Sequence, residues 1–222
     1  RVAKQQCVGP LQLPLNNVGV MALDFKSTEG IATTVGHSPI AALVDPVAGS
    51  RNAIAESLSN LVFAPIQNGL AGVSLSANWM WACNNEGEDA RLYEAVKGCS
   101  DFALELGINI PTGKDSLSMK QKYPNGENVI APGTVIISAA GNCTDINKVV
   151  EPVLNKEAGS VYYINLSQDT FKLGGSSFAQ ILNKIGNEVP TIKDGAYFKK
   201  AFNTIQNAIN TNLVEAGHDI GS

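Results

Sequence analysis

The stretch from Leu75 to Met119 constrains the fold more than any other part of the chain. Its sequence is LSANWMWACNNEGEDARLYEAVKGCSDFALELGINIPTGKDSLSM. It begins with the alternation typical of a half-buried strand and passes through an acidic turn. Helical periodicity follows from Gly87 to Gly107, and then a Gly-Lys-Asp-Ser sequence. A strand, a helix and a polar loop in this order predict a β/α layer with a polar site at its end.

The length and composition indicate a globular chain. Its 222 residues suffice for one large domain or two small ones, and 44% are hydrophobic while 16% are charged. The net charge is -4, and the lysines and arginines form no run, so we expect no nucleic-acid partner. No apolar stretch reaches the roughly 20 residues of a membrane-spanning helix, so we expect no membrane partner either.

Cysteine and histidine spacing argues against thiol, imidazole and zinc chemistry. The four cysteines are far apart in the sequence: Cys7, Cys83, Cys99 and Cys143. They form no CxxC pair, and the chain has only two histidines, so neither a zinc site nor a compact disulfide framework is favoured. We expect free thiols, as in a reducing cytoplasm.

Periodicity predicts the remaining elements in two parts. The expected strands are Val18–Leu23, Pro39–Val44, Val73–Ala77, Thr134–Ala140 and Val161–Leu166, and the further expected helices are Val47–Phe63, Ser177–Ile185 and Ala196–Leu213. The first of these helices has Asp45 as a candidate cap and Pro46 at its start. A polar segment with a proline separates the parts, so we predict domains at 1–143 and 159–222 joined by a linker at 144–158.

The helix at Val47–Phe63 presents a polar stripe beside its apolar face. Asn52, Glu56 and Asn60 are spaced four residues apart, so they project from one side. Carboxylate and amide oxygens suit Mg²⁺, which makes this stripe a metal candidate. The alternative is a solvated helix face.

Three other motifs have both a functional and a structural interpretation. Gly113-Lys114-Asp115-Ser116 lacks the spaced glycines of a P-loop, but Lys114 could neutralise a phosphate; otherwise it is a tight turn with an exposed lysine. Gly174-Gly175 precedes a predicted helix and is either an anion site or, more commonly, a packing turn. Trp79 and Trp81 could form a stacking surface, but their strand spacing favours packing on one face of a sheet, and they are assigned to structure.

From Gln5 to Asp219 the sequence resembles phosphoribosylformylglycinamidine synthase of the large, single-chain kind. The resemblance rests on the Leu75–Met119 stretch, on Glu56-Ser57-Leu58-Ser59-Asn60 and on Gly217-His218-Asp219. It matches the second of two repeats related to aminoimidazole ribonucleotide synthetase. The implied fold is α/β (α+β), with a ferredoxin-like synthetase N-terminal part up to about Cys143 and a truncated α/β C-terminal part.

The resemblance also implies site residues. The implied metal ligands are Asn17, Glu56, Asn60 and Asp219, and the implied nucleotide contacts are Asn16, Gly221 and, in a supporting role, Lys114. Asn17 stands where the family usually has Asp, and Gly221 where it usually has Ser, so both departures weaken the transfer. Asn52 is not part of the family set. No catalytic residue is implied in this stretch.

The parent enzyme implied by the resemblance converts phosphoribosylformylglycinamide to the amidine in purine biosynthesis, with ATP, Mg²⁺ and ammonia from glutamine. The glutaminase domain and the first repeat lie outside this chain. What remains resembles the repeat with a structural ADP, so we expect a cytoplasmic nucleotide-binding piece that is inactive alone. Its partners would be nucleotide and the rest of the synthase chain, or a second copy through the exposed sheet. The alternative is an independently catalytic ATP-dependent domain of the aminoimidazole ribonucleotide synthetase or selenophosphate synthetase type.

Overall fold

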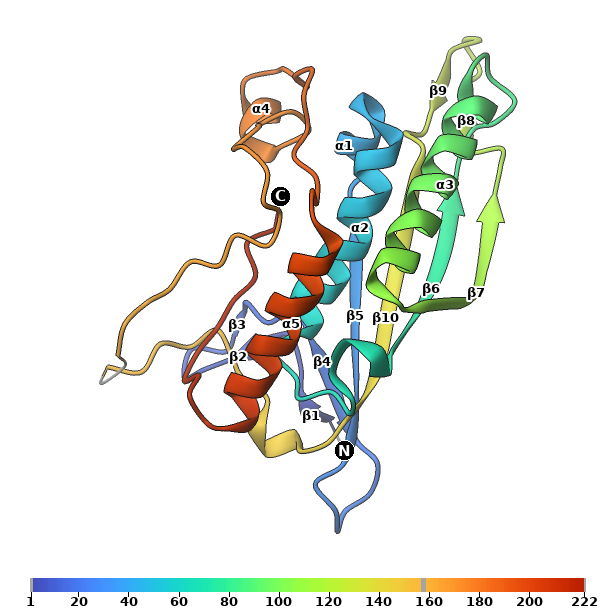
Figure 1. Cartoon of the computed structure of the whole chain (residues 1–222). Coiled ribbons are helices and arrows are strands. Elements are labelled where there is room, and N and C mark those ends of the chain that lie inside the picture. The colour runs from blue at the N-terminus through green and yellow to red at the C-terminus, as the bar shows by residue number, and fades with distance from the viewer. Residues whose placement is uncertain (1, 157–158, 222) are drawn as a thin grey trace.

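The computed structural model describes residues 2–156 and 159–221, which are built around a mixed six-stranded sheet (Figure 1). In spatial order the strands are β1 (Val2–Lys4), β4 (Gly19–Ala22), β5 (Gly30–His37), β10 (Thr134–Cys143), β6 (Val73–Met80) and β7 (Asn109–Ser116). Two short ribbons pair β2 (Cys7–Val8) with β3 (Leu13–Pro14), and β8 (Lys120–Lys122) with β9 (Asn128–Ile130). The sheet pairs are antiparallel except β6 with β7.

The β6–β7 pair is parallel because α3 (Glu88–Leu106) connects the two strands. Parallel neighbours need a crossover connection, and a helix is its usual form. The helix ends at Gly107, whose φ of 72° lies in the left-handed region that glycine adopts without strain. The strand and the helix predicted within Leu75–Met119 are therefore confirmed, whereas the predicted Gly-Lys-Asp-Ser loop is part of β7.

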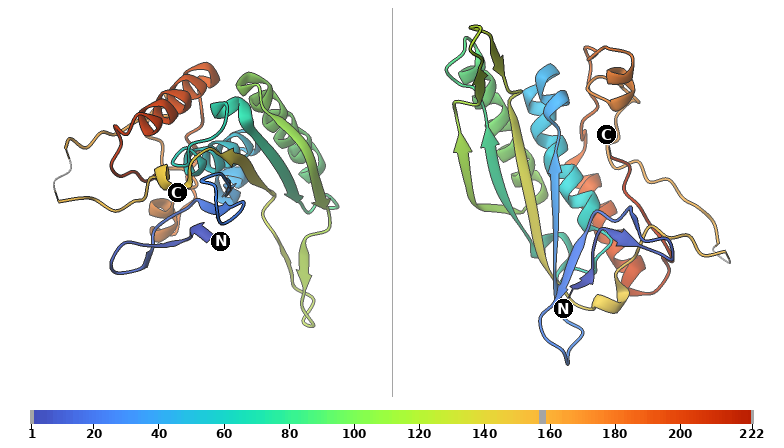
Figure 2. Two further views of the ribbon diagram at one scale, coloured as in Figure 1. Left: turned by 90° about the horizontal axis from the view of Figure 1, so that it is seen from below. Right: turned by 180° about the vertical axis from the view of Figure 1, so that it is seen from behind.

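Helices cover one side of the sheet (Figure 2). Besides α3 these are α1 (Pro39–Val44), α2 (Pro46–Leu61) and α5 (Gly195–Asn210). The short helix α4 (Ser177–Ile181) lies away from the sheet, and η1 (Gly69–Gly72) and η2 (Ile146–Lys148) are 3-10 turns. α2 begins as the sequence predicts: the Asp45 side chain accepts from Ala48 N, and proline follows at the first helical position. α2 packs on β5 and β10, and α3 packs on α2.

The core lies between the sheet and these helices. Inward residues of the strands, such as Leu75 and Ile137, share one apolar cluster with Leu58 of α2 and Phe102 of α3. Phe198 of α5 joins the same cluster and meets the Phe102 ring edge-on, with centroids 6.0 Å apart. The mixed α/β class is confirmed. The domain boundaries at 143 and 159 stay a prediction. α5 belongs to the predicted second domain, yet it packs into the core of the first.

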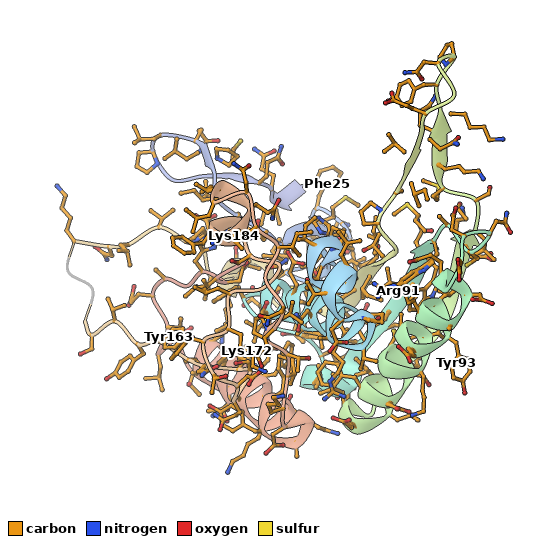
Figure 3. The ribbon with its side chains drawn as sticks, turned by 90° about the horizontal axis from the view of Figure 1, so that it is seen from above. Phe25, Arg91, Tyr93, Tyr163, Lys172 and Lys184 are labelled. Atoms are coloured by element: carbon orange, nitrogen blue, oxygen red, sulfur yellow. The ribbon has the colours of Figure 1, made fainter. Side chains whose placement is uncertain are left out.

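One predicted strand is a helix. Pro39–Val44 forms α1, which starts with proline at its first turn and buries Ala41 and Ala42. Arg91 reaches across from α3 and donates to the carbonyls of Ala42 and Leu43 at 2.6 and 3.0 Å (Figure 3). Tertiary contacts therefore stabilise a six-residue helix that its local sequence alone does not indicate.

Two predictions in the C-terminal part also need correction. Val161–Leu166 is not a strand, because no neighbouring strand among the described residues pairs with it, and Tyr162 is left 82% exposed. The helix predicted at Ser177–Ile185 ends at Ile181. The expected helix at Ala196–Leu213 is confirmed as α5, and it is docked by Gln206, whose buried amide accepts from Ile66 N and donates to the carbonyls of Val62 and Ala64.

The opposite face of the sheet carries no helix among the described residues. It is apolar towards β4 and β5, where Met21 is 58% and Val35 51% exposed, and polar towards β6, where Ser76 and Asn78 point outward. Side chains such as Tyr93 on the outer face of α3 are also exposed (Figure 3).

The approach of α2 to β5 depends on Gly36. A Cβ on Gly36 would lie 2.2 Å from the carbonyl oxygen of Ala53 and 2.4 Å from Ser57 N. Both contacts are with helix backbone, so neither can be relieved by a side-chain rotation. The close approach lets Thr34 Oγ1 donate to Ser57 O at 2.7 Å.

We predict that Gly36→Ala lowers the free energy of unfolding by about 3 kcal/mol, at the upper end of overpacking costs, because the helix must move off the strand. Gly159→Ala is the matched control, since nothing lies within 4 Å of a Cβ there. Urea unfolding of both variants measures the effect; equal stabilities would contradict the steric explanation.

Candidate functional site

A cleft of about 780 Å³ lies where the start of β4, the end of β5, α2 and the C-terminal segment meet. Six of the residues predicted from the sequence line it: Asn16, Asn17, Glu56, Asn60, Asp219 and Gly221. β4 pairs with β5 only as far as Thr33, so the last residues of β5 present a free edge. The cleft opens beside that edge.

The segment before β4 is held by Asn16. Its side chain is 8% exposed, and its amide nitrogen donates to Gln5 O at 2.9 Å and to Val18 O at 2.7 Å. These two bonds fix the backbone around the neighbouring Asn17, which is exposed to the cleft.

Glu56 and Asn60 are attached to the free edge of β5. Glu56 Oε2 accepts from His37 N at 2.7 Å, and Asn60 Nδ2 donates to Val35 O at 3.1 Å. Since this bond fixes the amide orientation, Asn60 Oδ1 is left buried with no hydrogen-bond partner among the described residues. A buried, unpaired acceptor at a cleft is a site for a donor or a cation.

Burial raises the pKa of Glu56 above its ordinary value of 4.5. The His37 N–H bond and the His37 imidazole act in the opposite direction, and the Asp219 carboxylate adds a smaller upward contribution. Ionising this carboxylate therefore costs free energy unless a cation lies nearby. A bound metal ion would supply that positive charge.

Asn17 and Asp219 meet across 202 residues of sequence. Asn17 Nδ2 donates to both carboxylate oxygens, at 2.9 and 3.0 Å. The Asp219 side chain is 5% exposed, and His218 Nδ1 lies 3.4 Å from its Oδ1. Asn17 thus presents its nitrogen to the acid; to ligate a metal with oxygen, its amide would have to rotate.

Two predicted residues lie elsewhere. Asn52, the third member of the polar stripe, donates to Pro190 O at 2.8 Å and does not line the cleft. Lys114 is neither in a loop nor in a turn: it lies in β7 and donates to Ser116 Oγ at 2.8 Å. It is in register with Asn78, then Ile136, then His37, which puts three strand spacings, about 14 Å, between it and the edge of the cleft.

Several residues that the sequence did not single out also line the cleft, among them His37, Thr33 and Ser138. The sequence indicates a site only weakly at His37, Thr33 and Ser138, because each occupies an outward position of an alternating strand. Both histidines of the chain, His37 and His218, therefore border one cleft.

The donor set fits a hard cation such as Mg²⁺. It offers two carboxylates, Glu56 and Asp219, and the free amide oxygen of Asn60. Among residues 2–156 and 159–221, no group of three or more His, Cys, Asp or Glu side chains could hold a metal, so amide oxygen and water would complete the shell.

The Gly174-Gly175 motif forms a packing turn. A Cβ on Gly174 would lie 2.2 Å from Glu188 O, and Gly175 packs against Ala41 of α1. The Trp81 ring is 1% exposed, which agrees with a structural role, and all four cysteines are free.

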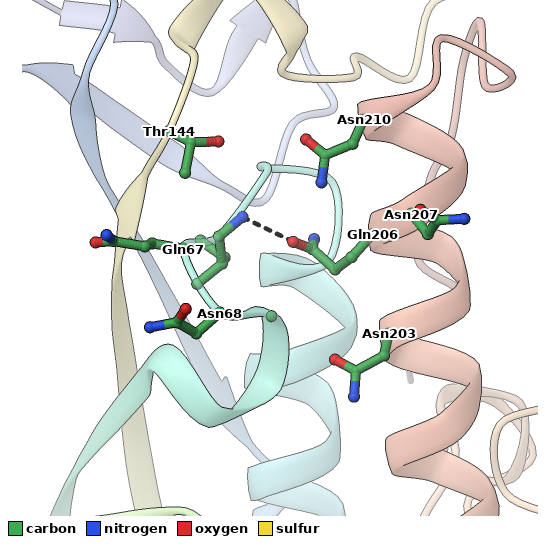
Figure 4. A pocket seen from close by; sticks show the side chains of 9 residues that line it. Gln67, Asn68, Thr144, Asn203, Gln206, Asn207 and Asn210 are labelled. Carbon is green, nitrogen blue, oxygen red and sulfur yellow. Dashed lines mark hydrogen bonds between the residues drawn. The ribbon is translucent and has the colours of Figure 1, made fainter.

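A second depression of about 480 Å³ lies between α5 and the turn that precedes η1 (Figure 4). Carboxamides line it, including Gln67, Asn68 and Asn203. Asn203 Oδ1 accepts from Leu70 N at 3.0 Å, and Gln206 Oε1 accepts from Ile66 N at 2.7 Å. The buried amide of Gln206 and the exposed amide of Asn203 join α5 to the first part of the chain.

With this geometry established, the comparisons with known proteins decide the family. The family described as "FGAR-AT PurM_N-like domain" matches residues 1–142. The chain belongs to this family.

The full length of the chain is similar to phosphoribosylformylglycinamidine synthases. Over 99% of its length it is 44% identical to the probable chloroplastic/mitochondrial enzyme of Arabidopsis thaliana, 42% to the probable enzyme of Caenorhabditis elegans and 40% to the human enzyme. It spans only 16–17% of the length of these relatives.

Solved structures show the same fold. Thermotoga maritima PurL complexed with FGAR matches with a TM-score of 0.61 at 14% identity, over 93% of this chain and 31% of that one. PurLQS from the same organism matches with a TM-score of 0.50 at 18% identity, over 62% and 21%. None of the helices in the described residues has the length and apolarity to cross a membrane.

We predict that Glu56→Gln stabilises the ligand-free chain above pH 5 or so. With its pKa raised, Glu56 binds a proton more tightly in the folded than in the unfolded state, so its contribution to stability falls as pH rises from 4.5 through the folded-state pKa. Glutamine removes this loss and can still accept from His37 N. Urea unfolding between pH 4 and 8 should show the two proteins converging at the acid end.

The control is Glu215→Gln, at an exposed position. A variant at Glu56 that is less stable than wild type at pH 7 without metal would refute the desolvation argument.

Proposed function

We propose that this chain is part of a phosphoribosylformylglycinamidine synthase and forms its nucleotide-binding, non-catalytic repeat. The whole enzyme would use ATP and glutamine to amidate formylglycinamide ribonucleotide in purine biosynthesis. The similarity to named synthases over 99% of the chain supports this assignment. The structure of Thermotoga maritima PurL complexed with FGAR, which shares the fold over 93% of this chain, agrees with it.

The observation that carries the site proposal is the convergence of Asn17, Glu56, Asn60 and Asp219 on one cleft. These residues come from the start, the middle and the end of the chain. Glu56 and Asp219 would hold Mg²⁺ together with Asn60 Oδ1, while Asn16, Gly221 and, if the assembled enzyme brings it closer, Lys114 would contact ADP. When bound, the ion would neutralise the phosphate charges.

The protein's own contribution at this site would be positioning. Hydrogen bonds to β5 hold Glu56 and Asn60 in place before any ligand arrives. Asn17 carries no charge, so the site offers one negative charge fewer than with an aspartate there. The missing carboxylate favours a structural over a catalytic role for this repeat, and we infer that the chain alone is inactive.

A second candidate is an independently catalytic ATP-dependent domain. Its support is the pair of histidines at the cleft, since His218 Nδ1 lies 3.4 Å from Asp219 Oδ1 and could relay a proton. ATP hydrolysis by the purified chain, abolished by His218→Gln, would favour this candidate over the structural one.

The remaining partners would be other parts of the synthase. The uncovered sheet face with Met21 and Val35 suits packing against the first repeat, and in its absence against a second copy. The free cysteines agree with a reducing compartment such as the cytoplasm. The Arabidopsis relative is named as chloroplastic/mitochondrial, so location differs among relatives.

We predict that in the full-length synthase Glu56→Ala lowers thermal stability and ADP retention more than turnover. A ligand present at about 1,000 times its dissociation constant stabilises the folded state by roughly 4 kcal/mol, which the variant would lose. Calorimetric melting and nucleotide analysis of the desalted protein measure both effects. Asn52→Ala, on the same helix stripe but outside the cleft, is the control. If Glu56→Ala melts like wild type while turnover falls about a thousandfold, roughly 4 kcal/mol of barrier, the repeat is catalytic.

We predict that the isolated 222-residue chain dimerises through the uncovered sheet face at tens of micromolar, the order of a weak association. Met21→Lys should shift it towards monomer, because it places a charge in the apolar part of that face. Leu104→Lys, at a 76% exposed position on α3, should not. Light scattering that shows a wild-type monomer at this concentration would rule the dimer out.

A further inference from the structure

The C-terminal segment reaches the cleft by passing over the end of α2 at Gly217. A Cβ on Gly217 would lie 2.2 Å from Phe63 Cε1, 2.8 Å from Cδ1 and 3.2 Å from Cζ. Gly217 is not among the described residues with positive φ, so it is required for space rather than for backbone conformation. Phe63 lies two residues after the end of α2 and packs against the main core, so its ring has limited freedom to yield.

Hydrogen bonds hold the segment at the same point. Gly217 N donates to Glu151 O at 3.2 Å, and the adjacent Val150 N donates to Phe63 O at 2.9 Å. The Glu151 side chain pairs with Lys4 of β1 at 2.6 Å. The C-terminal segment is therefore anchored, through residues 150 and 151, to both α2 and the edge of the sheet.

This anchor lies two residues before Asp219. No helix or strand is present in 213–221, so the position of Asp219 depends on such local contacts. On its other side Asp219 is held by Asn17 through both carboxylate oxygens. Phe63 lies three residues after Asn60, just beyond the end of α2, so the contact fixes the spacing between Asp219 and the two residues of that helix.

We propose that Gly217 is a positioning residue: its bare Cα against Phe63 sets the Asp219 carboxylate opposite Glu56 and Asn60 at the nucleotide–metal site. The inference rests on the proposed function of the cleft and adds a residue that touches neither metal nor nucleotide. A side chain at 217 would push the segment outward and carry Asp219 away from α2. The fold would be spared, because the displaced segment follows the last helix.

The test uses the full-length synthase and measures release of bound ADP in Mg²⁺ buffer, together with melting of the nucleotide-free protein. Gly217→Ala should release ADP about 10- to 100-fold faster, the usual effect of losing support around a metal ligand, with little change in the nucleotide-free melting temperature. Gly159→Ala, where a Cβ meets nothing within 4 Å, should behave like wild type.

Rescue separates this contact from a general structural effect. Phe63→Val removes the three ring atoms that a Cβ at 217 would meet, so the double variant Gly217→Ala/Phe63→Val should recover slow ADP release, relative to Phe63→Val alone. Wild-type release from Gly217→Ala, or a double variant as fast as Gly217→Ala, would overturn the inference and leave the site proposal intact. If wild type holds no ADP, or Asp219→Ala and Glu56→Ala hold it normally, the proposed function fails and the inference with it.

Discussion

The rest of the structure depends on the contact between the backbones of α2 and β5 at Gly36. With no Cβ in the way, the helix lies close enough for Thr34 to bond to Ser57 O, for His37 N to bond to Glu56 and for Asn60 to bond to Val35 O. These bonds cover the end of β5 that β4 leaves unpaired. A strand edge that would otherwise need a neighbour thus becomes one wall of a polar cleft.

The opposite wall comes from the far end of the chain. Gln206 docks α5 on the first part through three buried hydrogen bonds, and Gly217 then directs the following segment past Phe63 to Asp219. The cleft is therefore complete only when sequence-distant segments have packed. Its charges remain poorly compensated in the ligand-free state, since burial raises the pKa of Glu56 and the hydrogen bonds to Asp219 come from the neutral amide of Asn17. Stability and ligand binding are consequently coupled at this site.

Much of the fold could be predicted where a segment's own pattern is strong. The periodicity of α2 and α3, the alternation of β6 and the turn residues around them indicate the β6–α3–β7 unit without reference to the rest of the chain. Two short segments were predicted wrongly. The apolar run of α1 is typical of a strand, but Arg91 of α3 donates to two of its carbonyls and stabilises a helix instead. Val161–Leu166 has the composition of a strand, but no strand among the described residues pairs with it.

For the candidate site, the sequence by itself determined the chemistry of the donors and, through their resemblance to a known family, which of them to consider together. Helix periodicity placed Glu56 and Asn60 on one stripe, but it placed Asn52 there as well. Only the tertiary structure decided that Asn52 turns to Pro190, that Lys114 lies across the sheet and that His37 borders the cleft. The physical reason is that local periodicity fixes the direction of a side chain relative to its own helix or strand, whereas its neighbours depend on how those elements pack.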